Sequence, residues 1–380
     1  MNIENQKGFA GATLAPDIQS AIDDMGFVNA TPVQEQTIPY FLTGMDLIVQ
    51  APTGTGKTGA FGIPIAQNVD ARDKSAQALI LSPTRELAIQ TANVLRRLTH
   101  HKKGILVATL YGGENIQRQF AVLRRRPQII VATPGRLIDH MRRETVRLQS
   151  VQTVVLDEAD RMLDMGFQDD LNAILQAIPA QRQTVLFSAT LSKAILGIAK
   201  NYQRDAKQIL VKQDTLTVKS VRQFYTTVRG GAKKNELTAL LRDHPRDLCL
   251  VFVNTKRMAD NLCAELQKDS FHADVLHGDI CQLKRERIMD AFRAGRIDIL
   301  VATDVAARGI DVRNIDLVVN YDLPADSDSY VHRIGRTGRA DRSGTAHTFV
   351  YSQEIGMLRT IMRDTKALIQ QTPPSLVAAV

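Results

Sequence analysis

A regular alternation of short apolar runs and helix-like segments constrains the fold of this chain more than any other feature. Each run is rich in β-branched residues, is bounded by Gly, Pro, Ser or Thr, and is separated from the next by a helix-like segment such as Arg85–His100. Strands that alternate with helices form parallel sheets with right-handed crossovers. The strands predicted in the first half are Asp46–Gln50, Ala78–Ser82, Gly104–Leu110, Gln128–Ala132, Thr153–Leu156 and Gln183–Ser188.

The alternation lapses once, in the polar stretch Lys212–Lys219, and then restarts. A chain of 380 residues also exceeds what one hydrophobic core usually supports. We therefore predict two tandem α/β domains, residues 1–212 and 220–380, joined by a linker at 213–219. The second domain is predicted to contain strands at Val221–Val228, Leu248–Val253, His272–Leu276, Ile297–Ala302, Leu317–Asn320 and Ala346–Val350, and a closing helix at Gln353–Gln370.

Composition excludes several classes of protein. No run approaches the roughly 18 apolar residues of a membrane span, and the polar N-terminus lacks the apolar core of an export signal. Cys249, Cys263 and Cys281 form no metal-type pair, which fits free thiols in a reducing cytoplasm. The net charge of +8 attracts phosphate backbones and anionic surfaces alike. Because Trp is absent and aromatic residues make up 5%, a stacking platform is not expected to be the main mode of strand binding.

The sharpest local signal is the segment Ala51–Thr58, which lies between a predicted strand and a helix-like segment. Its small residues would let backbone N–H groups approach phosphate oxygens, with a helix N-terminus behind them. Lys57 is predicted to reach the β- and γ-phosphates, and the Thr58 hydroxyl to bind Mg²⁺. Ala51 stands where the strict pattern has Gly, although Ala is small enough for a tight turn. A glycine-rich turn that binds no phosphate is the alternative.

Two adjacent carboxylates, Asp157 and Glu158, follow the predicted strand Thr153–Leu156. At the carboxyl end of a strand, both side chains can turn into the crevice where ligands bind. Asp157 is predicted to help hold Mg²⁺ through its water shell, and Glu158 to orient or deprotonate the attacking water. Acids in this position also commonly cap a helix. Their combination with the phosphate loop favours nucleotide hydrolysis over that alternative.

The run Asp157-Glu158-Ala159-Asp160 and the segments around it resemble the DEAD-box RNA helicase family. The match runs from Phe9 to Arg339, in order and with family-like spacing. The matching segments are GFVNATPVQ (26–34), PTREL (83–87), GG (112–113), TPGR (133–136), SAT (188–190), LVFVN (250–254), QLKR (282–285), ATDVAARGID (302–311) and HRIGRTGR (332–339). The resemblance implies two RecA-like domains, each a mostly parallel sheet flanked by helices, which use ATP and Mg²⁺ and bind RNA.

The resemblance also assigns roles to individual residues. Phe27 would stack on adenine, and the Gln34 amide matches the donor and acceptor of the adenine N6/N7 edge. The residues expected at the nucleotide are Phe9, Phe27, Thr31, Gln34, Thr53, Gly54, Thr55, Gly56, Lys57, Thr58 and Asp311. Those expected along the RNA backbone are Pro83, Thr84, Arg85, Gly113, Thr133, Gly135, Arg136 and Thr303. Those expected to couple hydrolysis to strand separation are Asp160, Ser188, Thr190, Arg308, His332 and Arg333. Arg336 and Arg339 resemble arginine fingers, which act in catalysis beside Lys57, Asp157 and Glu158.

The implied activity is RNA-stimulated ATP hydrolysis coupled to domain closure, with local, non-processive unwinding of RNA duplexes or remodelling of RNA–protein complexes. An ATP-gated RNA clamp or annealing protein would use the same residues and remains the alternative. Backbone contacts carry no sequence information, so specificity is expected either from protein partners or from segments of the protein beyond the given sequence. One feature outside these segments is the triplet Arg124-Arg125-Arg126, which fits either a solvated turn or an extra RNA contact.

Overall fold

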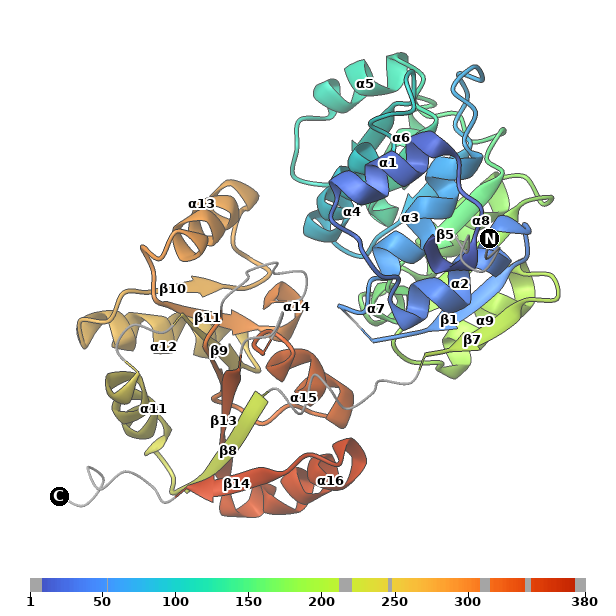
Figure 1. The fold of residues 1–380 in the computed structure, drawn as a ribbon. Helices are drawn as coiled ribbons and strands as arrows, with labels where there is room; N and C mark the ends of the chain where they lie inside the picture. Colours follow the sequence, from blue (N-terminus) through green and yellow to red (C-terminus); the bar gives the residue numbers. More distant parts are fainter. Residues whose placement is uncertain are drawn as a thin grey trace. The chain divides into compact units, whose positions relative to one another are not determined.

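The chain divides into two compact units, residues 1–213 and 214–380. The computed structural model describes residues 9–52, 54–211, 221–244, 248–307, 315–338 and 343–372. In each unit, helices flank a sheet whose seven described strands pair in parallel (Figure 1). The predicted fold class is therefore confirmed. The predicted linker at 213–219 lies outside the described residues.

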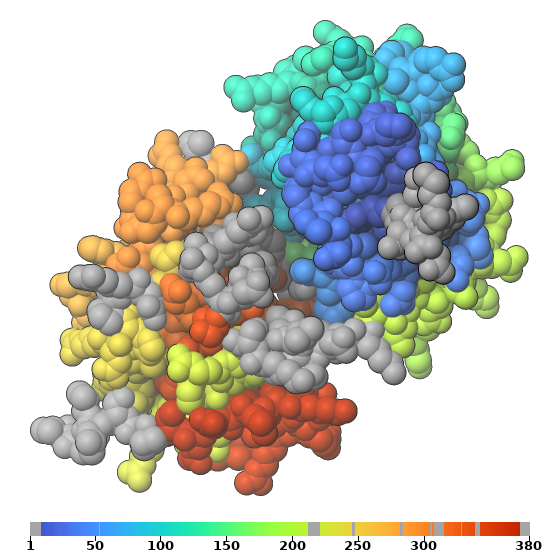
Figure 2. Space-filling view, in the orientation of Figure 1, coloured from blue at the N-terminus to red at the C-terminus, as the bar shows by residue number. Residues whose placement is uncertain are grey.

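The first unit follows the strand–helix alternation expected from the sequence. Its elements are η1 (Phe9–Gly11), α1 (Pro16–Asp24), α2 (Pro32–Leu42), β1 (Leu47–Gln50), α3 (Lys57–Asn68), β2 (Ala78–Leu81), α4 (Arg85–Leu98), β3 (Val107–Leu110), α5 (Ile116–Arg124), β4 (Ile129–Ala132), α6 (Pro134–Arg142), β5 (Thr153–Leu156), α7 (Ala159–Asp164), α8 (Gln168–Ala177), β6 (Gln183–Ser188), α9 (Lys193–Tyr202) and β7 (Lys207–Leu210). Edge strand β7 lies outside the predicted strands. Figure 2 shows that residues of the N-terminal helices form a broad part of the surface of this unit.

The strand order of the first sheet is β3-β4-β2-β5-β6-β1-β7. Successive side chains of a strand point to opposite faces, and β2 illustrates this. Ala78 and Ile80 join one buried apolar cluster, while Leu79 and Leu81 join the other. All four residues are buried, as expected for a parallel strand covered by helices on both faces. Burial on both faces fixes the register, so the carboxyl ends of the strands form a rigid edge.

The second unit repeats this architecture with strand order β10-β11-β9-β12-β13-β8-β14. Its elements are β8 (Val221–Val228), α11 (Lys233–Asp243), β9 (Cys249–Val253), α12 (Lys256–Lys268), β10 (Ala273–Leu276), α13 (Gln282–Arg293), β11 (Ile299–Thr303), α14 (Asp304–Ala307), β12 (Leu317–Asn320), α15 (Ser327–Ile334), β13 (Gly344–Tyr351), η2 (Ser352–Glu354), α16 (Ile355–Thr365) and β14 (Ile369–Thr372). No helix among the described residues of either unit is long and apolar enough to span a membrane.

The segment predicted as one closing helix, Gln353–Gln370, is helical from its start, where η2 leads into α16, but the prediction was wrong at its C-terminal end. The α-helix α16 covers Ile355–Thr365, and Lys366 ends it in a left-handed conformation with φ +53°. The chain then forms β14, which pairs in parallel with β8. The Thr372 hydroxyl contacts the Thr226 hydroxyl at 2.8 Å and donates to the Tyr225 carbonyl at 3.2 Å. Pairing with β8, a tertiary interaction, thus stabilises an extended conformation that the local sequence does not signal.

His347 on β13 makes the stability of the second unit pH-dependent. Its Nε2 lies 2.8 Å from the Thr226 hydroxyl, and burial lowers its pKa to about 4. In the unfolded chain the pKa of this histidine is near 6.5. Between about pH 6.5 and pH 4, His347 is therefore protonated in the unfolded chain and neutral in the folded chain, which favours unfolding. We therefore expect the contribution of His347 to stability to be full above about pH 6.5 and to fall by up to about 3 kcal/mol as the pH approaches 4.

We expect His347→Asn to reduce the loss of stability between pH 6.5 and pH 4, because asparagine does not titrate and binds no proton at this position in either state. The measurement is the free energy of unfolding by urea at a series of pH values from neutral to 4. His100→Asn, which changes an exposed histidine of the first unit, is the matched control. An unchanged slope in His347→Asn would show that His347 does not control this pH dependence.

Candidate active site

The phosphate loop ends where helix α3 begins at Lys57. Gly56 is the N-cap of the helix with φ +95°, and as a glycine it makes no side-chain cap hydrogen bond to the first N–H groups. A Cβ at Gly56 would lie 2.8 Å from Gln34 Nε2, so both this close contact and the positive φ favour glycine here. The buried Lys57 ammonium donates to the Ala51 carbonyl at 3.1 Å, which holds it inside the loop. The loop therefore offers N–H groups and a cation to an anionic ligand.

Asp157 at the end of β5 is a buried carboxylate with an incomplete set of partners. It is 2% exposed, and its Oδ1 has no hydrogen-bond partner among the described residues. Burial raises the pKa of Asp157, and the charge of Lys57 opposes that effect. A buried unpaired carboxylate oxygen is costly unless a cation or a donor satisfies it. The site therefore fits a cation held together with nucleotide phosphates.

Glu158 takes a backbone conformation that few non-glycine residues adopt. Its φ is +53°, in the left-handed region, and α7 begins directly after it. Its carboxylate accepts a hydrogen bond from the buried Arg161 guanidinium, Nη1 to Oε2, at 2.9 Å. Strained residues of this kind persist only where the surrounding structure enforces them. Here the ion pair holds one carboxylate oxygen beside Asp157, at the edge that carries the phosphate loop.

Asp160 connects the acidic run to the segment after β6. Its Oδ2 accepts hydrogen bonds from the N–H groups of Ala189 at 2.9 Å and Thr190 at 3.0 Å. The Ser188 hydroxyl donates to the Thr190 carbonyl at 2.6 Å. The structure thus brings together Asp160, Ser188 and Thr190, the three first-unit residues predicted to couple hydrolysis to strand separation. That coupling role stays a prediction.

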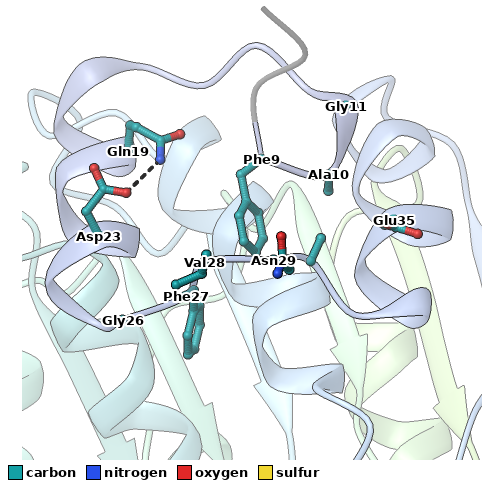
Figure 3. A pocket seen from close by; sticks show the side chains of 11 residues that line it. Phe9, Ala10, Gly11, Gln19, Asp23, Gly26, Phe27, Val28, Asn29 and Glu35 are labelled. Atoms are coloured by element: carbon teal, nitrogen blue, oxygen red, sulfur yellow. Dashed lines mark hydrogen bonds between the residues drawn. The ribbon is translucent and has the colours of Figure 1, made fainter. Parts of the chain in front are cut away.

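The aromatic residues predicted at adenine line a surface cavity of about 660 Å³ (Figure 3). The rings of Phe9 and Phe27 are stacked, with centroids 6.5 Å apart and planes inclined by 24°. Gln34 is not among the residues that line this cavity. Its Oε1 accepts from the Thr31 N–H at 3.0 Å, and its Nε2 donates to the Gly56 carbonyl at 3.1 Å. Gln34 therefore also fixes the phosphate loop, a role that the sequence did not indicate.

The strand order places the candidate residues that follow strands of the first unit in two groups along the carboxyl edge of the sheet. The first-unit residues predicted at the RNA backbone follow β3, β4 and β2, which are adjacent strands. The phosphate loop follows β1 and the carboxylates Asp157 and Glu158 follow β5, and these two strands flank β6. Thr84 and Thr133 are the N-caps of α4 and α6, and Gly113 has φ +82°. The Arg85 guanidinium lies 4.4 Å from the centre of the Tyr111 ring. Two adjoining groups of side chains thus occupy the carboxyl edge, where ligands of α/β sheets bind.

Arg136 is positioned by residues that the sequence analysis missed. Its Nη1 and Nη2 donate to the Glu114 carbonyl at 3.2 Å, and Nη1 also donates to Gln119 Oε1 at 3.2 Å. Gln119 is 2% exposed, and the same oxygen lies 2.9 Å from Nε2 of the fully buried His140. Burial lowers the pKa of His140, which favours its neutral form. A glutamine on an amphipathic helix is read from sequence as a surface residue, so no local signal marks it.

Comparisons with known proteins identify the family of this chain. The DEAD/DEAH box helicase family model matches residues 31–197, and the helicase conserved C-terminal domain model matches residues 232–341. The DEAD-box ATP-dependent RNA helicase CshA of Geobacillus kaustophilus is 47% identical over 96% of this chain and 78% of its own length. Its namesake from Bacillus subtilis is 46% identical over 94% of this chain and 72% of its own length. The chain belongs to the DEAD-box ATP-dependent RNA helicase family.

Two solved structures that contain RNA show the same fold. Saccharomyces cerevisiae Dbp5 bound to RNA and ADP–BeF3 has a TM-score of 0.83 and 34% identity, covering 95% of this chain and 94% of Dbp5. Mss116p bound to single-stranded RNA and AMP-PNP has a TM-score of 0.82 and 30% identity, covering 95% of this chain and 78% of Mss116p.

In this DEAD-box chain, Arg333 ties together the carboxyl ends of three adjacent strands of the second unit. The guanidinium is 1% exposed and makes a bidentate pair with Asp304, with both N–O distances 2.6 Å. It also donates to the Asp322 carbonyl at 2.6 Å and to the Asn254 side chain at 2.9 Å. These partners follow β11, β12 and β9. Arg333 is therefore a structural residue of the second unit, and its predicted coupling role stays a prediction.

The other second-unit candidates of the helicase fall into two groups. Thr303 ends β11 and Arg336 follows α15; both are 9% exposed, and His332 is half-buried on α15. Arg308, Asp311 and Arg339, together with Thr53 of the first unit, lie outside the described residues.

Proposed function

We propose that this chain hydrolyses ATP in response to RNA and separates short stretches of RNA duplex or remodels RNA–protein complexes. The carboxyl edge of the first sheet carries the proposal, since phosphate-loop residues and candidate backbone contacts occupy adjoining parts of one rigid edge. The ligands of the Dbp5 and Mss116p structures, RNA with an ATP analogue, support the same pair of substrates. The relatives are named helicases, so an ATP-gated clamp or annealing protein is not favoured.

The test is a duplex-unwinding assay beside an annealing assay, with RNA-stimulated ATP hydrolysis measured on the same RNA. We expect ATP-dependent unwinding of short duplexes and little annealing. Lys57→Ala is the matched inactive protein, because it removes the cation of the phosphate loop. ATP hydrolysis without duplex separation, accompanied by annealing, would favour the clamp.

The chain's own residues suit phosphoryl transfer to water. Lys57 would bind the β- and γ-phosphates, and Glu158 would accept a proton from the attacking water. Mg²⁺, when bound, would neutralise charge on the phosphate oxygens. Thr58 and Asp157 would help hold it, and the unpartnered Oδ1 of Asp157 supports this. No group of three or more His, Cys, Asp or Glu among the described residues is placed to hold a metal ion. The ion would therefore also depend on phosphate and water oxygens.

Adenine selectivity is expected from Gln34 with Phe9 and Phe27. We expect ATP to be preferred to GTP, and Gln34→Ala to reduce that preference by about 1–3 kcal/mol, or roughly 5- to 150-fold. Gln34 also holds Gly56, so the variant should bind every nucleotide less well. The ratio of kcat/KM for ATP to that for GTP cancels this common loss and is the quantity to measure. Equal use of ATP and GTP by the unaltered chain would contradict the assignment.

Two further proposals concern where and with whom the chain acts. Backbone contacts do not select an RNA, so we expect protein partners to supply specificity. The cysteines Cys249, Cys263 and Cys281 are free, and two of them are buried, which supports a reducing compartment such as the cytoplasm.

A further inference from the structure

A second cavity of about 460 Å³ opens on the opposite edge of the first sheet. Its lining includes Ala76, Pro127 and Ser150, which precede β2, β4 and β5. The candidate active site follows the other ends of these strands. A strand rises about 3.3 Å per residue, so four-residue strands separate the two edges by roughly 13 Å. The cavity is therefore distinct from the nucleotide and backbone sites described above.

The cavity is lined by three arginines, Arg124, Arg126 and Arg147. All three are exposed, and within the described part of the chain their guanidinium groups make no ion pair or hydrogen bond. Glu144 is the one carboxylate in the lining. Lys74 also lines the cavity, so the described lining carries an excess of positive charge. Such a lining is suited to an anion with several acceptor oxygens, and guanidinium matches phosphate in particular.

The backbone around the arginines is fixed by the fold. Helix α5 ends at Arg124, and the Arg126 N–H donates to the Leu123 carbonyl at 2.9 Å with Arg126 at φ +56°. The buried Pro127 then leads into β4. On the other side of the cavity, the Thr145 hydroxyl lies 2.8 Å from His140 Nδ1. The arginines are thus presented from a defined turn, and little loop ordering would accompany ligand binding.

The composition of the lining distinguishes between sources of phosphate. None of the described residues that line this cavity is Phe, Tyr, Trp or His, whereas Phe9 and Phe27, the aromatic residues predicted at adenine, line the first cavity. A site for a free nucleotide would be expected to hold the base by stacking, as single-stranded sites do. A site without aromatic residues is suited to backbone phosphates that are bound without reading the base. The lining therefore favours the phosphates of an RNA strand over a mononucleotide.

We propose that Arg124, Arg126 and Arg147 form an auxiliary RNA-backbone site at the amino edge of the first sheet. The proposal rests on the RNA-dependent function proposed above and extends it to RNA that continues beyond the backbone contacts at the carboxyl edge. Short strands would occupy the carboxyl edge alone. Longer or structured RNA would also bind the arginine site and so remain bound more tightly.

The test is the full-length triple variant Arg124→Gln, Arg126→Gln, Arg147→Gln. Its matched control is Arg97→Gln, Lys103→Gln, Lys200→Gln, which removes the same charge from exposed positions outside both cavities. Binding is measured by fluorescence anisotropy over a salt series. The probes are a single strand of roughly 10 nucleotides, within the range of about 4–16 that one single-strand-binding domain covers, and a strand several times longer. Thermal unfolding and ATP hydrolysis with the short RNA check that the variants are folded and active.

We expect the triple variant to lose roughly tenfold in affinity for the long RNA at low salt. Its log–log salt slope should fall by about 2, because three single-strand phosphate contacts contribute roughly 0.7 each. Binding of the short RNA, and both affinities of the control, should stay unchanged.

Equal long-RNA binding by the triple variant and the control would overturn the proposal. So would a GDP site that the triple variant loses while long-RNA binding persists, which would assign the cavity to a free nucleotide. If the unaltered chain binds neither RNA and shows no RNA-stimulated hydrolysis, the proposed function fails as well.

Discussion

Glu158→Gln should lower the rate of ATP hydrolysis by roughly 10²- to 10⁴-fold, the usual contribution of a general base. The amide has nearly the shape of the carboxylate but cannot accept the proton of the attacking water. Lys57 and Asp157 remain in place, so binding of ATP and RNA should persist. The loss should therefore appear in kcat rather than in KM. Single-turnover hydrolysis, together with equilibrium binding of a labelled nucleotide, separates the two quantities.

Because Glu158 pairs with Arg161, the effect of this variant on stability must be separated from its effect on turnover. The variant loses a partly buried ion pair, which by itself lowers stability, so thermal unfolding must be measured beside activity. Glu265→Gln, which changes an exposed glutamate on α12, serves as the matched variant and should leave turnover unchanged. Near-normal turnover in a folded Glu158→Gln protein would remove Glu158 from the catalytic residues.

The strands and helices of the core were predictable because local sequence and tertiary environment agree there. Strands such as β2 and β4 are buried on both faces, so the chain carries uninterrupted apolar runs at these positions. The edge strands are different. In β7, Ile209 is the one buried residue, and the four residues of β14 are largely polar. Such segments become strands through pairing with a neighbouring strand, and the periodicity of the local sequence does not predict that pairing.

The candidate site divides in the same way. Lys57, Asp157 and Glu158 could be proposed from the sequence because loop chemistry at strand ends leaves a strong signal. The strand order was not available from sequence, and it alone shows that the proposed backbone contacts follow adjacent strands. Gln119 and His140 were missed for a related reason. Their role comes from burial next to Arg136, and burial of a single polar residue on a helix depends on what packs against it.

Arg333 and Arg336 belong to one segment, yet the structure gives them different expected roles. Arg333→Ala would leave Asp304 without its bidentate partner and loosen the strand ends around it. Removing one member of a buried pair costs about 3–5 kcal/mol, so this variant should unfold more easily and lose activity for that reason. Arg336 lies beyond the end of α15 and takes no part in the contacts that Arg333 makes to Asp304, Asp322 and Asn254. The comparison of the two variants therefore separates loss of structure from loss of chemistry.

Arg336→Ala should lower kcat by on the order of 10³-fold, the lower end of the range measured for arginine fingers. A finger stabilises charge that develops only in the transition state, so KM for ATP should change little while kcat and kcat/KM fall together. Arg336→Lys should recover only part of the rate, because an ammonium keeps the charge but lacks the planar fork that binds two phosphate oxygens.

The measurement is RNA-stimulated turnover at saturating RNA and a series of ATP concentrations, with thermal unfolding recorded for both variants. A folded Arg336→Ala protein with full turnover would exclude a catalytic role for this arginine. A lower melting temperature with kcat restored on cooling would assign Arg336 to the structure of the second unit instead.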